Sequence, residues 1–535
     1  MLSCRNLFTC LIVGFTLTFC GQTFASEPVT FTDANLEAAV RDKLGIPSNP
    51  IYDTDMASMT GTLNMYYLGI ANLVGMEYAT NLEELRLRDN SVSDLTPISG
   101  LTAHLTVIDV AYNNVSNISP VAGLVNLTSL NLDSNGVSNI APVAGLTNLE
   151  MLYLDDNGIS NIGPVAGLTS LHSLFLNDNN LTDISAVQNL TNLATLDVNN
   201  NNLTNISPVV NLTSMTHLEM NSNSISDISP LAGMTLVSSL FLDNNNISDI
   251  STLSELSSLI SLHLEDNQIE DIAPLAGLTN LRYLYLKNNQ IQTIRLSGAD
   301  LPLLQGFDVT NNSVKTVLLD RATMNQTVFE SLMNGRSSTR KGIAELTSVL
   351  TLDMSRVDFA DVSDFSSMYT MDHVETLSFV NAANLDGSDV VTLTGQLYAL
   401  DWLNVAGVWD TFDTAEQNAL LAWDAGVGNS LVTLFGDANG DGTVDGSDAT
   451  ILANYWQVGV NDGQTANWSM GDFNGDGQVD GSDATLLASH WQESNTTTAT
   501  TVPEPAALTM LLTLAGLAML WKKRKGKSKL LFIEQ

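Results

Sequence analysis

The stretch LYLDDNGISNIGPVAGLTSLHS, residues 152–173, is followed directly by LFLNDNNLTDISAVQNLTNLAT, residues 174–195. In both, two leucines flank one variable residue, and an asparagine stands three positions after the second leucine. This asparagine recurs at steps of 22 residues, with steps of 23 at the two ends: Asn90, Asn113, Asn135, Asn157, Asn179, Asn201, Asn223, Asn245, Asn267, Asn289 and Asn312. Such a fixed period indicates a repeat architecture in which each unit packs mainly on its neighbours.

Each part of the repeat has a physical role. Leu152 and Leu154 are expected to point inward from a short parallel strand, and Asn157 to turn inward and pair with backbone groups that leucine cannot satisfy. Pro164 and Gly167 mark the return stretch on the opposite side of the coil. One unit cannot bury its own apolar face, so stability must come from stacking. The sequence therefore predicts an α/β solenoid with parallel strands.

The pattern over 57–312 resembles the leucine-rich repeat, and its 22-residue form resembles the bacterial internalin-like subfamily. Residues 26–56 contain FTDANLEAAVR at 31–41, which resembles the N-terminal capping helix of that subfamily. Its apolar positions 36, 39, 40 and 44 fall on one helical face. The resemblance implies a horseshoe with its strands on the concave face and a helical N-terminal cap.

Beyond Asn312 the period changes. Strand-like patterns recur at Leu352, Leu377 and Leu403, with helical stretches expected at Ser388–Leu400 and Thr414–Trp423. We expect residues 313–434 to form divergent longer repeats and a C-terminal cap that extend and close the solenoid. A separate small α/β domain over 346–434 is the alternative.

Two acidic loops follow, DANGDGTVDGSD at 437–448 and DFNGDGQVDGSD at 472–483. Oxygen ligands at loop positions 1, 3, 5, 9 and 12, a backbone carbonyl at position 7 and glycine at position 6 match what Ca²⁺ requires. The pattern predicts two calcium ions, with a solvated acidic loop as the alternative. The expected ligands are Asp437, Asn439, Asp441, Thr443, Asp445 and Asp448 in the first loop, and Asp472, Asn474, Asp476, Gln478, Asp480 and Asp483 in the second.

One amphipathic helix follows each loop, and no helix enters it. This arrangement over 435–493 resembles a type I dockerin, which implies a small all-α calcium-binding domain that docks onto a cohesin. The docking residues of that family, at loop positions 10 and 11, correspond to Gly446, Ser447, Gly481 and Ser482. Glycine at position 10 offers a weak side-chain contact, and such modules also act as calcium-stabilised spacers.

The composition is strongly acidic, with 20 Lys and Arg against 58 Asp and Glu and a net charge of −38. Residues 26–501 hold 13 of the basic and 56 of the acidic residues, a net charge of −43, and no Lys or Arg lies between Arg88 and Arg282. A surface this acidic repels phosphate, which argues against nucleic-acid binding.

Both ends of the chain are expected to be targeting signals. Residues 1–25 have the basic start, apolar stretch and small final residue of a secretory signal peptide, to be removed by signal peptidase. All three cysteines lie there, and a lipoprotein anchor at Cys20 is the alternative reading; an exported chain without them has no disulfide.

At the other end, a Thr-rich linker at 494–502 precedes residues 503–535, in which Pro503-Glu504-Pro505 leads into an apolar run, 506–521, and a basic cluster. We expect the apolar run to form a short transmembrane helix at the lower limit of spanning length. The segment resembles the PEP C-terminal sorting signal of Gram-negative bacteria, which implies cleavage by an exosortase and delivery to the cell surface or extracellular matrix. A permanent single-span anchor is the alternative.

The residue between the two leucines, and the residue after them, should lie on the concave face. Exposed aromatic residues among Asp and Asn are typical of surfaces that bind proteins or sugars. We therefore expect a recognition surface for a protein or glycan, with a solvated strand face carrying scattered aromatics as the alternative. Its candidate contacts are Tyr153, Phe175, Phe241, His263 and Tyr285.

Nothing in the sequence favours catalysis. None of the six histidines sits in a metal-ligand spacing, and no nucleophile elbow or phosphate-binding glycine loop is present. A carboxylate pair at glycosidase distance is the one catalytic arrangement that sequence leaves open. The leading hypothesis is a non-enzymatic recognition or adhesion protein. The alternatives are a calcium-crosslinked matrix component without a specific ligand and a subunit of a polysaccharide-degrading assembly.

Overall fold

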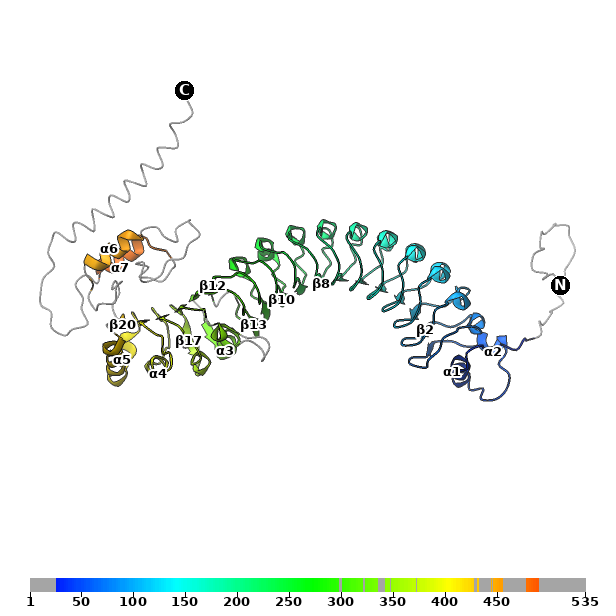
Figure 1. The fold of residues 1–535 in the computed structure, drawn as a ribbon, viewed down its shortest axis with the longest axis horizontal. Helices are drawn as coiled ribbons and strands as arrows, with labels where there is room; N and C mark the ends of the chain where they lie inside the picture. Colours follow the sequence, from blue (N-terminus) through cyan, green and yellow to red (C-terminus); the bar gives the residue numbers. More distant parts are fainter. Residues whose placement is uncertain are drawn as a thin grey trace, which may run out of the picture.

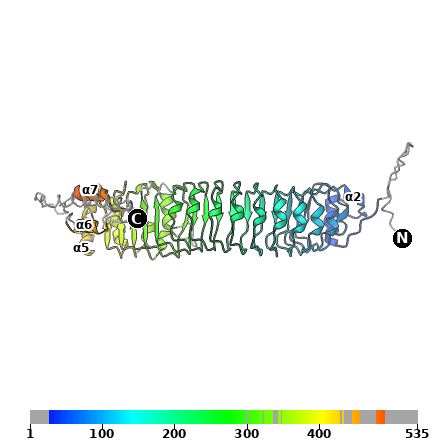
Figure 2. The ribbon, with the colours of Figure 1, turned by 90° about the horizontal axis from the view of Figure 1, so that it is seen from above.

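The computed structural model describes residues 26–297, 301–320, 323–334, 342–346, 348–371, 373–427, 431–432, 444, 446–455 and 478–489. The larger part is a solenoid whose coils lie side by side along one axis (Figures 1 and 2). It begins with a helical cap made of α1, Ala34–Leu44, and α2, Asp53–Ala57. Leu36 and Val40 of α1 are fully buried and Ala39 and Leu44 pack against the core, as the apolar face predicts.

The first sheet has twelve parallel strands in chain order, with β13 following β11. Neighbouring strands pair equivalent residues, such as Leu152 with Leu174 and Tyr153 with Phe175. The leucine-rich repeat solenoid predicted from the period is confirmed. The strands are β1 Thr62–Asn64, β2 Glu84–Arg86, β3 Val107–Asp109, β4 Ser129–Asn131, β5 Met151–Tyr153, β6 Ser173–Phe175, β7 Thr195–Asp197, β8 His217–Glu219, β9 Ser239–Phe241, β10 Ser261–His263, β11 Tyr283–Tyr285 and β13 Gly306–Asp308.

Short 3-10 helices lie on the opposite, convex side of these coils (Figure 1). Many have the Pro of the return stretch as their second residue, and an Asp or Asn side chain caps the turn; Asn161 Oδ1, for example, accepts from the Gly163 N–H at 2.8 Å. They are η1 Met76–Tyr78, η2 Thr96–Ile98, η3 Ser119–Gly123, η4 Ala141–Gly145, η5 Gly163–Gly167, η6 Ser185–Val187, η7 Ser207–Val209, η8 Ser229–Leu231, η9 Ser251–Glu255 and η10 Ala273–Leu275.

The asparagine of each repeat joins two neighbouring coils. Asn157 Nδ2 donates to the carbonyls of Leu132, Leu154 and Asp155, and its Oδ1 accepts from the Val137 N–H at 2.9 Å. The residue before each of these asparagines is left-handed, as at Asp156 with φ of 51°. Because that conformation costs energy for a residue with a side chain, the bonds of the asparagine are what keep the turn in place.

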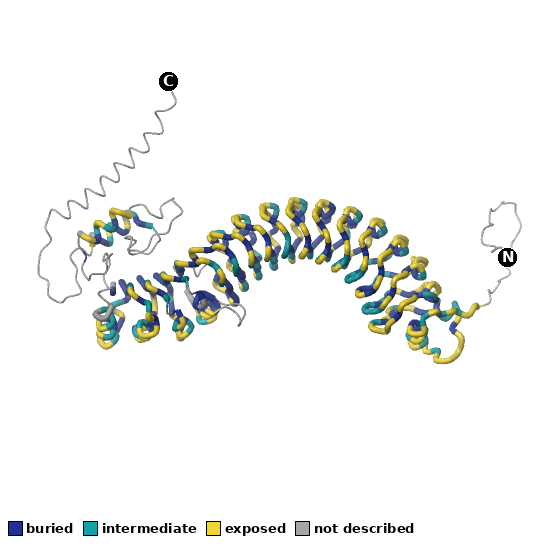
Figure 3. The backbone as a smooth tube through the Cα atoms, in the orientation of Figure 1, coloured by how far each residue is buried: buried dark blue, intermediate teal, exposed yellow. Residues whose placement is uncertain are grey.

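Buried residues recur from coil to coil along the solenoid (Figure 3), and nearly all of them are apolar. In a single repeat seven of them are at most 2% exposed: Leu152, Leu154, Ile159, Ile162, Val165, Leu168 and Leu171. Each such burial contributes about 1.5–3 kcal/mol, so the solenoid is held together by one continuous ladder of aliphatic side chains.

A second parallel sheet begins before the first one ends. Its six strands run in the order β12-β14-β16-β18-β19-β20. β12 belongs to the coil of β11, and β14 to the coil of β13, yet both occupy the return side of the coil, where earlier coils have a 3-10 helix (Figure 1). The strands are β12 Thr293–Ser297, β14 Thr316–Asp320, β16 Thr351–Asp353, β18 Thr376–Ser378, β19 Trp402–Asn404 and β20 Leu431–Val432.

Helices take over the other side of these coils. α3, Gln326–Asn334, contacts β13 and so continues the row of the first sheet; α4, Gly387–Gln396, and α5, Thr414–Val427, follow on the same side (Figure 1). A further strand pair, β15 Thr323–Asn325 with β17 Asp358–Asp361, and the 3-10 helices η11 Ile343–Glu345, η12 Ser366–Met368 and η13 Trp409–Thr411 complete this part. A single horseshoe with one strand-lined face therefore describes the coils only as far as β13; beyond it, strands and helices exchange sides.

The C-terminal part is described only in pieces. The two helices expected after the acidic loops are present as α6, Gly446–Asn454, and α7, Gly481–Ser489, and they contact each other. The predicted signal peptide, linker and sorting signal lie outside the described residues. Among the residues that are described, no helix is long and apolar enough to cross a membrane.

Candidate binding surface on the concave face

Two side-chain positions of every repeat point out of the first sheet. One is the residue between the two leucines, at the end of each strand, and the other is the residue just after the second leucine. Because the strands are in register, each position forms a row across the concave face. We call these two rows together the concave face.

Tyr153 and Phe175 form the first aromatic pair in these rows. Their rings stack with centroids 4.7 Å apart and planes only 2° from parallel, and both side chains are partly exposed. The two facing surfaces of the rings are used by the pair itself. Ring edges and the two outer faces are what remain for a ligand.

Phe241, His263 and Tyr285 form a second aromatic group three repeats further on. The His263 ring lies 4.3 Å from Phe241 and 4.7 Å from Tyr285, between the two. Phe241 and His263 are partly exposed, but Tyr285 is only 1% exposed. The prediction of Tyr285 as a contact residue is therefore wrong: burial turns its ring into a support for His263 instead of a surface for a ligand.

Side-chain oxygens in the second row bind the backbone of the next repeat. Asp133 Oδ1 accepts from the Asp155 N–H at 2.9 Å, and Asp155 Oδ1 accepts from the Asn177 N–H at 2.7 Å. Asn199, Asn221 and Asp243 repeat the bond. This row is thus a ladder of carboxylate and amide oxygens, fixed in position by main-chain donors.

Burial raises the pKa of three carboxyl groups on the concave face. Burial, assisted by the neighbouring Asp133 carboxylate, raises the pKa of Asp155 to about 7. Burial and the nearby Glu219 raise the pKa of Asp197 to about 7 in the same way. Burial likewise raises the pKa of Asp133. Arg88 partly offsets the rise at Asp133, but no Lys or Arg lies between Arg88 and Arg282 in the sequence, so acidic side chains outnumber basic ones on this part of the face.

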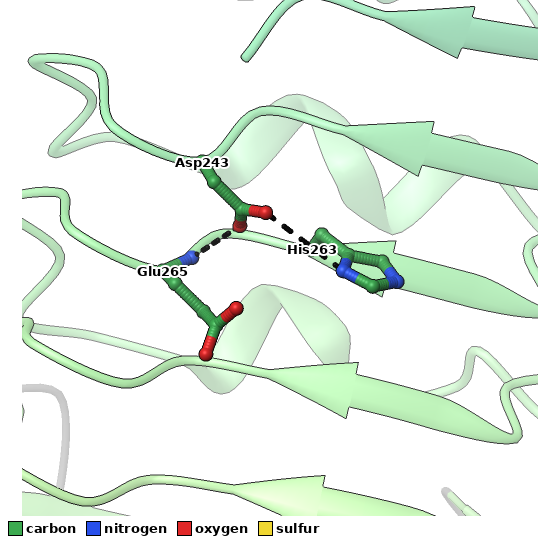
Figure 4. Close-up of side chains that lie close together, drawn as sticks. All are labelled: Asp243, His263 and Glu265. Carbon is green, nitrogen blue, oxygen red and sulfur yellow. Dashed lines mark hydrogen bonds and ion pairs between the residues drawn. The ribbon is translucent and has the colours of Figure 1, made fainter. Parts of the chain in front are cut away.

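Sequence reasoning missed one cluster on this face. Asp243, His263 and Glu265 each offer a ligand atom, and these atoms lie within 4.8 Å of one another (Figure 4). His263 belongs to no metal-ligand spacing in the sequence, and the fold alone brings it next to these two carboxylates. The cluster joins two repeats. In the sequence one carboxylate lies 20 residues before the histidine and the other two residues after it, and no local motif contains this spacing.

Basic side chains stand at the two edges of the acidic region. Arg86 pairs with Glu84 at 2.9 Å, and the Arg88 guanidinium lies 4.6 Å from the centre of the Tyr112 ring. At the other end Lys287 follows β11. The concave face is thus an acidic, aromatic strip between two cationic margins.

The predicted calcium ligands are described only in part. Asp448 and Asp483, the twelfth residues of the two loops, are fully buried at the starts of α6 and α7, and Asp483 Oδ2 accepts from the Asp480 N–H at 2.8 Å. Gln478 and Asp480 are partly buried. Buried carboxylates are costly without a compensating charge, which fits a bound divalent cation. The remaining predicted ligands lie outside the described residues: Asp437, Asn439, Asp441, Thr443, Asp445, Asp472, Asn474 and Asp476.

The predicted cohesin contacts lie at the starts of the two helices. Gly446 and Gly481 are the first residues of α6 and α7, and Ser447 and Ser482 follow them. Both serines are exposed. Ser482 donates through its N–H and its hydroxyl to Asp480 Oδ1, at 2.8 and 2.6 Å. Its hydroxyl hydrogen is therefore already used in a hydrogen bond within the chain.

Comparisons with known proteins agree with this architecture. The model of the dockerin type I domain matches residues 435–492, and models of leucine-rich repeats match 80–137, 147–190, 191–233 and 235–277. No curated protein sequence matches the chain significantly.

Solved structures that match include two proteins of Listeria monocytogenes. The internalin InlF is 27% identical, with 67% of this chain and 98% of that chain covered and a TM-score of 0.46. Internalin C2 is 34% identical, with 47% and 92% covered and a TM-score of 0.33. The Arabidopsis thaliana receptor kinase GASSHO1/SCHENGEN3, in complex with CASPARIAN STRIP INTEGRITY FACTOR 2, is 18% identical; 71% of this chain and half of that chain are covered, with a TM-score of 0.43.

Proposed function

We propose that this chain, which carries leucine-rich repeats and a dockerin type I domain, is a non-enzymatic recognition protein of the bacterial cell surface or extracellular matrix. The concave face of its solenoid binds a protein partner that carries basic groups. Its dockerin module holds two calcium ions and attaches the protein to a cohesin. The N-terminal leader exports it, and the C-terminal segment is processed by an exosortase.

The observation that carries this proposal is the pairing of partly exposed aromatic rings with carboxylates on one face. Aromatic residues in such positions supply much of the binding energy at protein interfaces. Tyr153 and Phe175 turn their inner faces toward each other, which leaves one outer face on each ring besides the edges. Stacking on a sugar ring needs a broad open face, whereas ring edges fit between the side chains of a protein. This favours a protein over a glycan as the partner.

The charge of the face defines the partner further. Seven acids lie in the two rows from Asp109 to Glu265, and no Lys or Arg lies between Arg88 and Arg282 in the sequence. Complementary charge speeds association and excludes acidic partners. A partner with several lysines or arginines along an extended surface would supply the positive charge that balances the acidic strip.

Calcium is proposed from the loop pattern and from the burial of Asp448 and Asp483. The ion would supply the positive charge that these carboxylates need, and Asp480 and Asp483 would serve as two of its ligands in the second loop. The Asp480 N–H donates to Asp483 Oδ2 at 2.8 Å, which supports a loop that brings these two proposed ligands together. Docking would then use Ser447, Ser482 and the exposed sides of α6 and α7.

A direct test uses the full chain immobilised in calcium and exposed to surface proteins of the bacterium that produces it. A partner retained by the native chain should bind at least tenfold more weakly to the Tyr153→Ala and Phe175→Ala variants. Tyr398→Ala is the matched control, because Tyr398 is 84% exposed and lies outside the concave face. Equal binding of all variants would reject the concave face as the binding surface.

The same preparation separates the competing functions. A calcium-crosslinked matrix component would assemble with itself in calcium and retain no partner in a saturable way. An enzyme subunit would degrade polysaccharides, for which turnover is the readout.

For the processing steps, mass spectrometry of the mature protein should find termini near Ala25 and Pro503; an intact C-terminal apolar segment would favour a permanent anchor.

A further inference from the structure

The cluster of Asp243, His263 and Glu265 lies on the concave face, across two neighbouring repeats. His263 ends β10, Glu265 follows it by two residues, and Asp243 occupies the equivalent position one repeat earlier. His263 Nδ1 and Asp243 Oδ2 are 3.8 Å apart, and one ligand atom from each residue lies within 4.8 Å of the others (Figure 4). Imidazole and two carboxylates therefore converge on one point.

The imidazole ring is held in one orientation. Phe241 and Tyr285 contact its two sides, and Nε2 lies 3.0 Å from Ser261 Oγ. The tautomer with hydrogen on Nε2 donates to that hydroxyl and leaves a lone pair on Nδ1, the atom on the side of Asp243. Metal-binding histidines commonly use their second nitrogen in this way, because the outer hydrogen bond fixes the ring and its tautomer.

The Asp243 carboxylate is held by the ladder. Its Oδ1 accepts from the Glu265 N–H at 2.7 Å, and its Oδ2 is the atom nearest His263. The side chains of His263 and Asp243 are only 12% and 23% exposed. Desolvated carboxylates repel each other, so a cation between them lowers the free energy of the folded chain.

We infer that Asp243, His263 and Glu265 form a binding site for a divalent transition-metal ion such as Zn²⁺. One imidazole and two carboxylates are ligands that Zn²⁺ accepts, whereas Ca²⁺ prefers oxygen alone. Ligands around tetrahedral zinc lie roughly 3.3–3.6 Å apart, so rotation of the two carboxylate side chains by about 1 Å closes the site. Three protein ligands leave a fourth position for water or for a group of the bound partner.

Lys287 carries a positive charge that competes with a metal ion at the cluster. β10 and β11 are in register, with His263 opposite Tyr285, so Lys287 occupies the position of Glu265 one repeat further. A positive charge at this neighbouring position disfavours a second cation at the cluster. Removing this charge should strengthen metal binding, an effect that a merely structural role of the three residues would not produce.

The test is equilibrium dialysis of the full chain against Zn²⁺ with millimolar Ca²⁺ present to saturate the dockerin loops. We expect one saturable Zn²⁺ ion per chain, weakened about 100-fold or more in His263→Gln and Asp243→Asn and about tenfold in Ser261→Ala. Lys287→Gln should bind Zn²⁺ several-fold more tightly. His217→Gln is the matched control and should bind like the native chain, because that histidine is exposed at the start of β8.

A thermal melt of each variant with and without Zn²⁺ gives a second readout that also reports folding. The native chain should gain Tm with Zn²⁺, and His263→Gln should have a normal melt without that gain. If His263→Gln does not fold, Glu265→Gln takes its place in both measurements. Absence of a saturable site, unchanged binding in the folded ligand variants, or an equal loss in His217→Gln would overturn the assignment.

Discussion

Asp155 Oδ1 accepts a hydrogen bond from the backbone N–H of Asn177, one repeat further along the solenoid, at 2.7 Å. An asparagine carbonyl oxygen at the same place can accept this bond, as Asn199 does from Asn221 and Asn221 does from Asp243. The carboxylate at Asp155 is thus not required for the ladder, and its negative charge is a cost of having it there.

This cost predicts an unusual dependence of stability on pH. The pKa of Asp155 is about 7 when folded, against about 3.8 for an exposed Asp, and that of Asp197 is also about 7. The folded chain therefore binds more protons than the unfolded one between these values. The contribution of both groups is fully present below about pH 4 and is lost as the pH rises through 7. We expect the urea midpoint of the solenoid to fall between pH 5.5 and pH 8.

Asp155→Asn should remove part of that dependence. At pH 8 the amide keeps the bond to Asn177 without the charge, so the variant should be more stable than the native chain by about 1–2 kcal/mol after allowance for solvent screening. At pH 5 the difference should be smaller, because the folded Asp155 carboxyl is still protonated there. Urea titration at both pH values is the measurement, and a variant that is less stable at pH 8 would contradict the account.

The asparagine ladder makes a second prediction. Asn179 is 7% exposed; its Nδ2 donates to the carbonyls of Leu154 and Leu176, and its Oδ1 accepts from the Ile159 N–H. Asn179→Ala leaves these groups buried without a partner and should cost about 2–4 kcal/mol. Asn148→Ala is the control, because that exposed side chain makes one bond, to the Val125 carbonyl. Chemical denaturation should separate the two variants clearly.

The repeats were predictable because each residue of the pattern has one local role. The strands, the return stretch and the inward asparagine all follow from the 22-residue period, and the helices expected at 388–400 and 414–423 are present as α4 and α5, shifted by a few residues. The dockerin type I match over 435–492 was predictable for the same reason, since the acidic motif that points to it lies within 12 residues of sequence.

The exchange of sides was harder to predict. It begins where Thr293–Ser297 replaces the Pro-containing return stretch of the earlier repeats with a β-branched pair and alternating apolar residues. The same happens at Thr316–Asp320. This period-2 pattern favours a strand. Whether a second sheet forms depends on the pairing of β12 with β14 and of β14 with β16. The burial of Tyr285 and the cluster at His263 depend in the same way on neighbours that are far apart in sequence.

A third prediction concerns the junction between cap and repeats. Gly75 has φ of +107°, and a Cβ there would lie 2.7 Å from the Phe31 ring. Gly75→Ala should therefore lower the stability of the N-terminal end by about 2 kcal/mol or more, from backbone strain together with the displaced ring. Gly145→Ala is the control, since a Cβ at Gly145 meets nothing within 4 Å. Amide exchange in α1 should rise in the first variant alone.

A fourth prediction tests the calcium loops. Calorimetric titration of the full chain should give two Ca²⁺ ions, and Asp483→Asn should leave one, because it removes the buried carboxylate at the end of the second loop. Asp183→Asn serves as the control, since that residue caps a turn of the solenoid by accepting from the Ser185 N–H. An unchanged stoichiometry in Asp483→Asn would remove Asp483 from the ligand set.

The last prediction measures how far the concave aromatics support one another. The rings of Tyr153 and Phe175 stack 4.7 Å apart on neighbouring strands, so a double-mutant cycle to Ala should give a coupling of about 0.5–1.5 kcal/mol. Tyr153 and Phe241 lie four repeats apart and should give none. Coupling in the first pair alone means that the rings are already held in place without a ligand, so a partner binds them at little cost in side-chain entropy. Equal, near-zero coupling in both cycles would mean that the stack forms only weakly in solution, and binding would then have to order it.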